Sequence, residues 1–295
     1  MAKILITGAT GGLGSTVTAF LGEKLPTEDI AVMVRDSNSE KAVQFRQKGI
    51  EVREGDYDQP ESLNEAFTGI EVLYFVSGND LVARFEQHKN VVNAAKKADI
   101  KHILYTSSVR KNESEDAPLH LVVGLHAQTE ELIKESGINY TLLRHNLYGE
   151  VIPMFIGDKA KLLESKTIYL PTGKGSTAFV SRRDLAEAAA NILADAKAHE
   201  NKIYEFNGSQ TVTFEQIAQI ISEVTGEQIN YVSPTKEDFE STMASYGLPE
   251  GIIGMLTMFS LGIADGEFDQ QVNDFEKILG RETQSMKDFL TAVYA

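Results

Sequence analysis

The sequence predicts an α/β fold, in which a doubly wound parallel sheet is joined to a smaller, mostly helical C-terminal subdomain. Three observations support this prediction. Apolar strands alternate with amphipathic helices through the first half of the chain, a glycine-rich turn follows the first strand, and the pattern changes after about residue 150. Unbroken apolar strands that alternate with helices are typical of a parallel sheet covered on both faces.

The first half contains six candidate strands and five candidate helices. The strands are expected at residues 4–6, 30–34, from 50, 72–76, 102–106 and 140–143. The helices are expected at residues 12–23, 39–48, from 58, 82–98 and 124–136. Asp58, with Glu61 three residues later, has the spacing of a capping box and predicts the start of the third helix.

The second half has a helix at 184–195, a strand at 203–206, and a further helix opened by Thr213 with Gln216 three residues later. The last 60 residues are expected to be mostly helical. Glycines at positions 247, 251, 254 and 262 are expected to interrupt these helices. We therefore divide the chain into a domain of residues 1–150, on which residues 174–203 pack back, and a smaller substrate-side subdomain of residues 151–295.

Composition excludes several classes of function. The chain has 295 residues, a net charge of −15 and no cysteine. The charge disfavours nucleic acids and anionic membranes, and the missing cysteines exclude thiolate chemistry and disulfides. The stretch from Met1 to Thr7 is too short an apolar run for a signal peptide, and nothing reaches the length of a membrane span. We expect a cytoplasmic protein without a metal site, because its six histidines lack metal-ligand spacing.

The glycine turn is the strongest functional signal. It consists of Gly8, Ala9, Thr10, Gly11, Gly12, Leu13 and Gly14, placed between a strand and a helix. In the Rossmann dinucleotide-binding motif the first glycine allows a tight turn, the second a close approach to a pyrophosphate, and the third close helix packing. A purely structural turn is the alternative. We predict that this segment binds an NAD(P) cofactor at the start of the helix.

The end of the second strand bears on which cofactor is used. Arg35 is followed by Asp36. An acid here accepts from the ribose 2′-hydroxyl of NAD, whereas an arginine pairs with the 2′-phosphate of NADP. We favour NADPH over NADH because a guanidinium pairs well with phosphate. A solvated surface pair of Arg35 and Asp36 is the alternative.

Further cofactor contacts are expected where the other strands end, because ligands lie beyond the carboxyl ends of parallel strands. Asp56 and Tyr57 follow the third strand, near the expected adenine. The fourth strand ends with Val76 and Ser77. Thr106 and Ser107 end the fifth strand, near the expected nicotinamide.

Several stretches together resemble the NmrA-like atypical short-chain dehydrogenase/reductases, and within them the type 2 NAD(P)H:quinone oxidoreductases and triphenylmethane reductases. They are residues 6–14, 34–35, 55–57, 105–107, 137–144 and 181–184. The resemblance covers nearly the whole chain. It implies that NADPH is the cofactor, that position 35 faces the 2′-phosphate, and that a quinone-sized pocket lies between the lobes. It also places His126 and Tyr148 close to that pocket.

The chain lacks the Tyr-x-x-x-Lys pair with which ordinary members of the superfamily protonate a carbonyl oxygen. In our alignment Val122 and His126 stand at the tyrosine and lysine positions. Reduction of a simple ketone requires an acid, whereas a reduced quinone is a stable anion and a dye cation needs no proton. We therefore predict hydride transfer to quinones or similar flat, electron-poor acceptors, with His126 and Tyr148 as candidate catalytic residues.

Alternatives remain at this point. His126 is otherwise a helix-surface histidine, and Tyr148 packs between the lobes. A different class of function is a redox-sensing regulator that binds NAD(P) without turnover and reports to a protein partner. A sugar-nucleotide epimerase is disfavoured by the missing pair. The expected partner is a small quinone or dye-like molecule, and exposed helices of the first domain could form a homodimer.

Overall fold

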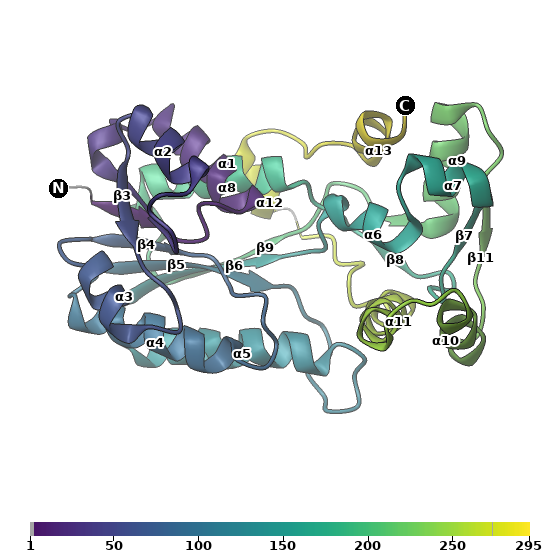
Figure 1. Ribbon diagram of the computed structural model, residues 1–295, viewed down its shortest axis with the longest axis horizontal. Helices are drawn as coiled ribbons and strands as arrows, with labels where there is room; N and C mark the ends of the chain where they lie inside the picture. The colour runs from purple at the N-terminus through teal and green to yellow at the C-terminus, as the bar shows by residue number, and fades with distance from the viewer. Residues whose placement is uncertain (1–2, 273) are drawn as a thin grey trace.

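The computed structural model describes residues 3–272 and 274–295. Met1 and Ala2, which begin the N-terminal stretch discussed above, lie outside the described residues, as does Asn273. The described chain has two parts side by side, a sheet flanked by helices and a smaller lobe built mainly from the C-terminal half (Figure 1).

Seven parallel strands form the main sheet, in the order β3-β2-β1-β4-β5-β6-β9. The strands are β1 (Ile4–Ile6), β2 (Ile30–Val34), β3 (Glu51–Glu54), β4 (Val72–Phe75), β5 (His102–Ser108), β6 (Asn139–His145) and β9 (Lys202–Phe206). The order reverses between β1 and β4, which is the switch point at which such sheets bind their ligands. The predicted doubly wound parallel sheet is confirmed.

Two layers of helices cover this sheet. One layer contains α1 (Gly12–Gly22), α2 (Glu40–Gln47), α8 (Arg182–Ala194) and α12 (Asp274–Leu279), and the other contains α3 (Pro60–Ala66), α4 (Arg84–Lys97) and α5 (His120–Glu135) (Figure 1). Alternate side chains of β5 enter different cores, because Leu104 packs toward α1 and α8 while Ile103 and Tyr105 pack toward α3 and α4. The apolar strands are therefore buried on both faces.

The helix α8 packs along α1, although 170 residues separate their starts in the sequence. The strand β9 then pairs with β6 at the edge of the sheet. Both helices run from the carboxyl edge of the sheet toward its opposite edge, so their N-termini lie at the ligand-binding edge. Segments from the second half of the chain thus help to build this edge.

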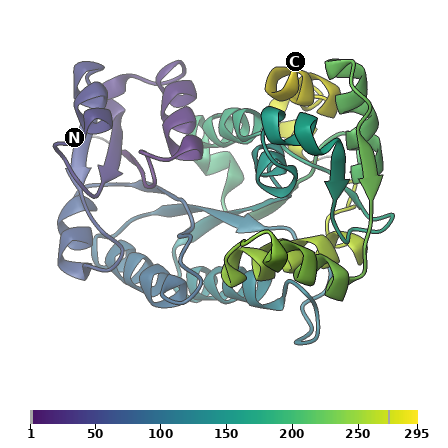
Figure 2. The ribbon, with the colours of Figure 1, turned by 45° about the vertical axis from the view of Figure 1, so that its right-hand side comes forward.

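The smaller lobe has its own hydrophobic core. Its helices are α6 (Ile152–Ile156), α7 (Lys159–Ser165), α9 (Phe214–Thr225), α10 (Lys236–Ser245), α11 (Glu250–Ala264) and α13 (Met286–Tyr294). Two small sheets accompany them, formed by β7 (Thr167–Tyr169) with β11 (Asn230–Val232) and by β8 (Ser176–Thr177) with β10 (Val212–Thr213) (Figure 2). Short 3-10 turns at Thr27–Asp29, Gly149–Val151 and Ala196–His199 complete the described elements. The lobe is mostly helical, as predicted.

No helix among the described residues is long and apolar enough to cross a membrane.

Candidate functional site

The glycine turn has the geometry that its sequence predicts. Gly8 adopts a positive φ of 60°, and its carbonyl accepts a hydrogen bond of 2.9 Å from the Gly11 amide. A Cβ on Gly14 would lie 2.4 Å from the Gly8 carbonyl oxygen, so only glycine fits there. Gly11 and Gly12 are exposed, while the Leu13 side chain is buried in the core beneath the turn. The turn therefore exposes backbone where a ligand can approach.

The N-terminus of α1 is open to an anion. Gly11 is its N-cap, no side chain caps it, and no acidic residue lies in its first turn. Its free N–H groups and the positive end of the helix dipole favour a phosphate. This opening, together with the space left by the glycines, fits the predicted dinucleotide.

Two cations that sequence reasoning missed lie beside this turn. The Lys41 ammonium, on α2, donates a hydrogen bond to the Thr10 carbonyl. Arg182, the first residue of α8, lies against Gly12, because a Cβ there would be 3.6 Å from the Arg182 Cδ. Arg182 has no ion pair among the described residues. Its guanidinium lies 5.3 Å from the Tyr148 ring centroid.

Arg35 and Asp36 differ in how they are engaged. Asp36 accepts a hydrogen bond of 2.8 Å from the Asn38 amide through its carboxylate, and its carbonyl accepts from Ser39. Arg35 is exposed and forms no ion pair within the described part of the chain. The carboxylate thus supports the loop before α2, and the guanidinium remains available to a ligand.

The residues after β3 tie the strands together. The Tyr57 hydroxyl donates to Thr7 Oγ1 at 2.6 Å or to the Val76 carbonyl at 2.8 Å, and Thr7 Oγ1 also accepts from the Val76 amide. The Asp56 carboxylate accepts from the Asp58 amide. Burial raises the pKa of Tyr57, so its hydroxyl stays protonated. Tyr57 therefore secures the ends of β1 and β4.

Thr106 and Ser107, at the end of β5, are both buried and both engaged. Thr106 Oγ1 accepts a hydrogen bond of 2.8 Å from the Ser77 amide. Ser107 donates to Glu130, a fully buried carboxylate that also accepts from Arg110 and Arg144. Burial would raise the pKa of Glu130, but these three hydrogen-bond donors lower it to about 2. The ion cluster fixes the end of β5.

His126 is buried on α5, not on the helix surface. Its Nδ1 lies 2.8 Å from the Tyr105 hydroxyl. Burial, with the charge of Arg84, lowers the pKa of His126 well below 6.5, so the imidazole is neutral. A phenol is the better donor and an imidazole nitrogen the better acceptor, so Tyr105 donates to Nδ1 and the ring proton is on Nε2. His126 is thus a neutral hydrogen-bond donor and not an imidazolium acid.

Tyr148 lies just beyond β6 and is partly buried. Its hydroxyl is 3.0 Å from Nδ1 of His145, and its backbone pairs with Val180. Burial raises the pKa of Tyr148, so the phenol is protonated. The hydroxyl is engaged with His145, and the ring packs against the core beneath α1 and α8 with the Arg182 guanidinium over it.

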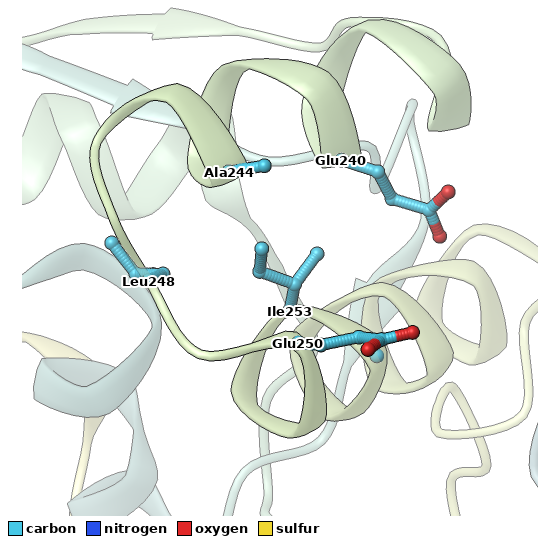
Figure 3. A pocket seen from close by; sticks show the side chains of 6 residues that line it. Glu240, Ala244, Leu248, Glu250 and Ile253 are labelled. Carbon is cyan, nitrogen blue, oxygen red and sulfur yellow. The ribbon is translucent and has the colours of Figure 1, made fainter.

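A pocket of about 510 Å³ lies elsewhere, between α10 and α11 (Figure 3). Leu248 and Ile253 provide apolar surface, and Glu240 and Glu250 add carboxylates to its lining. None of the residues predicted to bind a cofactor or acceptor lines this pocket. It belongs to the smaller lobe alone.

The structure thus gathers most predicted residues along one edge of the sheet. Gly8, Gly11, Gly12 and Gly14 form the turn, while Val76, Ser77, Thr106 and Ser107 end the two strands beside it. Lys41 was missed because no spacing links a residue of α2 to the turn. Arg182 belongs to a stretch that carried the resemblance, yet only the packing of α8 on α1 places it there. No cluster of three or more metal-ligating side chains occurs among the described residues.

Comparison with known proteins identifies the family of this chain along nearly its whole length. The model of the NmrA-like family matches residues 1–290. Quinone oxidoreductase 2 of Escherichia coli is 34% identical, with 99% of this chain and 98% of that protein aligned.

Solved structures are similar to this chain over nearly its whole length. The NADPH complex of the E. coli quinone oxidoreductase QOR2 has a TM-score of 0.90 at 34% identity and covers 98% of this chain and 99% of its own. The NADP(H) complex of Citrobacter sp. triphenylmethane reductase has a TM-score of 0.89 at 36% identity and covers 99% of this chain and all of its own. The resemblance predicted from the sequence is confirmed, and the chain belongs to the NmrA-like family.

Proposed function

We propose that this chain is an NADPH-dependent reductase that transfers hydride to quinones or similar flat, electron-poor acceptors. The observation that carries the proposal is the uncapped start of α1, with its exposed glycine turn and with Lys41 and Arg182 beside it. The related proteins named as a quinone oxidoreductase and as a triphenylmethane reductase support the same reaction class.

Different residues bind different parts of the cofactor. The backbone N–H groups at the start of α1 and the Arg182 guanidinium bind the diphosphate. Arg35 and Lys41 bind the 2′-phosphate. Arg35 directly follows β2, and Lys41 lies beside Thr10 of the glycine turn. This pair of cations favours NADPH, whereas Asp36 is held by its own loop and does not serve a ribose hydroxyl.

The reduced nicotinamide, when bound, supplies the hydride. Thr106 and Ser77 hold the ends of β5 and β4 together. With Nδ1 of His126 engaged by Tyr105, its Nε2–H would be the donor that this side chain offers to a ligand. We propose that the Tyr148 ring contacts the acceptor, which is the role expected of it from the sequence. None of these groups is a strong acid, which suits acceptors whose reduction requires no proton in the transition state.

We also propose that the two parts of the chain bind different ligands, as expected from the sequence. Residues 1–150 and the returning α8 serve the cofactor, and the lobe of residues 151–295 serves the acceptor. The net charge of −15 supports a small-molecule partner over nucleic acid. A cytoplasmic location and a homodimer stay predictions of the sequence.

A labelled hydride tests the reaction directly. NADPH that carries deuterium at both positions of the nicotinamide C4 is mixed with a triphenylmethane cation, and the leuco product is analysed by mass spectrometry. Direct transfer places deuterium on the central carbon of the dye. A leuco product without deuterium, or no product with dye and quinones alike, contradicts the proposed reaction.

A further inference from the structure

Among the described residues, Arg84 is a buried cation with no ion-pair partner. It is the first residue of α4 and only 7% exposed. Its Nε and Nη1 are fully shielded, and no described residue accepts a hydrogen bond from either. Buried charges are normally paired, because an unpaired charge loses its hydration without compensation. An orphaned guanidinium therefore requires an explanation.

The nearby acid does not provide one. The Asp80 carboxylate accepts hydrogen bonds from the amides of Val82 and Ala83 and caps the loop before α4. It forms no salt bridge with Arg84 within the described residues. Arg110 offers a contrast on the same side of the sheet, because its buried guanidinium pairs with Glu130 and, through Nε, with Glu113. The chain can thus neutralise a buried arginine, and no described residue does so for Arg84.

The packing of α4 against α5 places Arg84 close to the reaction edge. The two helices lie side by side beneath the sheet (Figure 1), and His88 Nδ1 is 2.9 Å from Thr129 Oγ1 across them. One turn toward both N-termini from this contact lie Arg84 and His126, since residues three or four apart share a helix face. The charge of Arg84 contributes to the lowered pKa of His126, second to burial.

His88 also links this cluster to the loop after β4. Its Nε2 accepts a hydrogen bond of 3.0 Å from the Gly78 amide, directly after Ser77. The loop that carries a predicted cofactor contact is thus attached to the helix that begins with Arg84. The unpaired cation lies at the carboxyl edge of β4 and β5 and not at a remote surface.

The proposed reaction generates the missing anion. As the C4–H bond of the reduced nicotinamide breaks, the hydride, which carries two electrons and one proton, forms a new O–H bond at one quinone oxygen, and the other oxygen becomes negative. Water later protonates this oxygen to complete the hydroquinone. We propose that Arg84 is the group that stabilises the negative charge developing on a quinone during hydride transfer at this site. This inference rests on the proposed reductase function, and it supplies the electrostatic role that the missing Tyr–Lys pair leaves open.

Two acceptors of opposite electrostatic character test the proposal. A quinone becomes an anion on accepting hydride, whereas a triphenylmethane cation becomes neutral. The variants are Arg84→Met and Arg84→Lys, with Arg53→Met as the matched control, since the Arg53 side chain hydrogen-bonds the carbonyls of Ala66 and Thr68 away from this edge. For each protein one measures kcat for both acceptors, the Kd of NADPH and the Tm.

Arg84→Met is expected to lower the quinone-to-dye ratio of kcat by about 100-fold, the effect of removing one preorganised charge-stabilising donor. Arg84→Lys should recover most of the ratio, because it retains the charge. The Tm should not fall, since an unpaired buried cation has been removed, and Arg53→Met should lower the Tm without moving the ratio.

Equal losses with quinone and dye, or a weaker NADPH Kd that accounts for the loss, would overturn the role of Arg84. An unchanged ratio in Arg84→Met would do the same. These outcomes are distinct from failure of the proposed function, in which the wild-type protein reduces neither acceptor.

Discussion

Gly14 is the residue at which a side chain meets the hardest obstacle in the glycine turn. A Cβ there would lie 2.4 Å from the Gly8 carbonyl oxygen and 3.0 Å from the Ala9 Cα. We expect Gly14→Ala to cost about 1–3 kcal/mol of stability through overpacking and to abolish tight NADPH binding. Thermal unfolding and a fluorescence titration with NADPH check both effects.

Gly22→Ala is the matched control, because Gly22 ends the same helix and no atom lies within 4 Å of its built Cβ. The control should be stabilising by at most about 1 kcal/mol, as glycine is a poor helix former. Equal behaviour of the two variants would refute the close packing of the turn.

Arg35 and Lys41 together should set the preference for NADPH. A hydrogen bond to a charged group contributes about 1.5–3 kcal/mol, so Arg35→Gln should weaken NADPH binding roughly 10- to 100-fold and leave NADH binding nearly unchanged. Lys41→Gln should act in the same direction. Arg182→Gln should weaken both cofactors by the same factor, because the diphosphate is common to them.

The ratio of the two dissociation constants, measured by titration, decides this assignment. A ratio that stays constant in Arg35→Gln and Lys41→Gln would remove both residues from the 2′-phosphate site. The sequence could single out Arg35 as a candidate because the end of β2 is a defined place in the motif, and its role stays a prediction. It could not predict Lys41 or Arg182, whose positions depend on how α2 and α8 pack.

At the scale of the elements, the strands were predicted best, since runs of buried apolar residues identify them. The start predicted for α3, at Asp58, was wrong. The helix begins at Pro60 without a side-chain cap, and Asp58 instead accepts hydrogen bonds from Gln87 on α4. The capping box of Thr213 and Gln216 is present as predicted. The same spacing therefore succeeds or fails according to the tertiary partners available to the first residue.

Glycines misled the prediction in the C-terminal part. Gly247 separates α10 from α11 as expected, but Gly251, Gly254 and Gly262 lie inside α11. Gly262 allows close packing, because its Cβ would be 2.6 Å from Leu119 Cδ1. The helix α5 likewise begins at His120, four residues before Gly124, directly after the buried Leu119. A helix packed tightly against its neighbour tolerates glycines that an isolated helix would not.

Glu130 joins α5 to the ends of β5 and β6 through its two arginines. Glu130→Gln leaves Arg110 and Arg144 without their counter-charge, so we expect a loss of about 3–5 kcal/mol in the free energy of unfolding. Glu131→Gln, on the exposed side of the helix, should change stability by no more than about 0.5 kcal/mol. Denaturant unfolding compares them, and similar losses in both variants would contradict a special role for the buried carboxylate.

For the whole molecule, the two-part architecture was predicted, but the small β7–β11 and β8–β10 sheets of the smaller lobe were not. Strands of two or three residues are too short to leave a periodic pattern. The proposed acceptor site is the least predictable part, because it would require side chains from both halves of the chain. His126 was identified by alignment, whereas its burial against Tyr105 emerged only from the fold.

Buried histidines should make the whole fold sensitive to acid. Burial lowers the pKa of His88 and His145 to about 3 and of His102 to about 4, and it lowers that of His126 as well. The unfolded chain binds these protons near pH 6.5, so their stabilisation is complete above that pH and declines as the pH falls toward the folded values. Below pH 6.5, each of these histidines should lower the free energy of unfolding by about 1.4 kcal/mol for each unit by which the pH falls.

Unfolding curves between pH 7 and pH 4.5 measure this slope. His102 is remote from the glycine turn. The substitution His102→Gln should reduce the slope by the contribution of one of the four histidines. A stability that is constant over this range would show that the four imidazoles are not buried as described.

The central claim is that this edge of the sheet reduces flat acceptors with NADPH. The most direct measurement is the fall in NADPH absorbance when the purified protein is mixed with a panel of quinones and a triphenylmethane dye, with NADH in parallel. The account predicts saturable consumption that is faster with NADPH. Tight NADPH binding in the same sample, without consumption for any acceptor, would contradict the reductase and favour a protein that senses the cofactor.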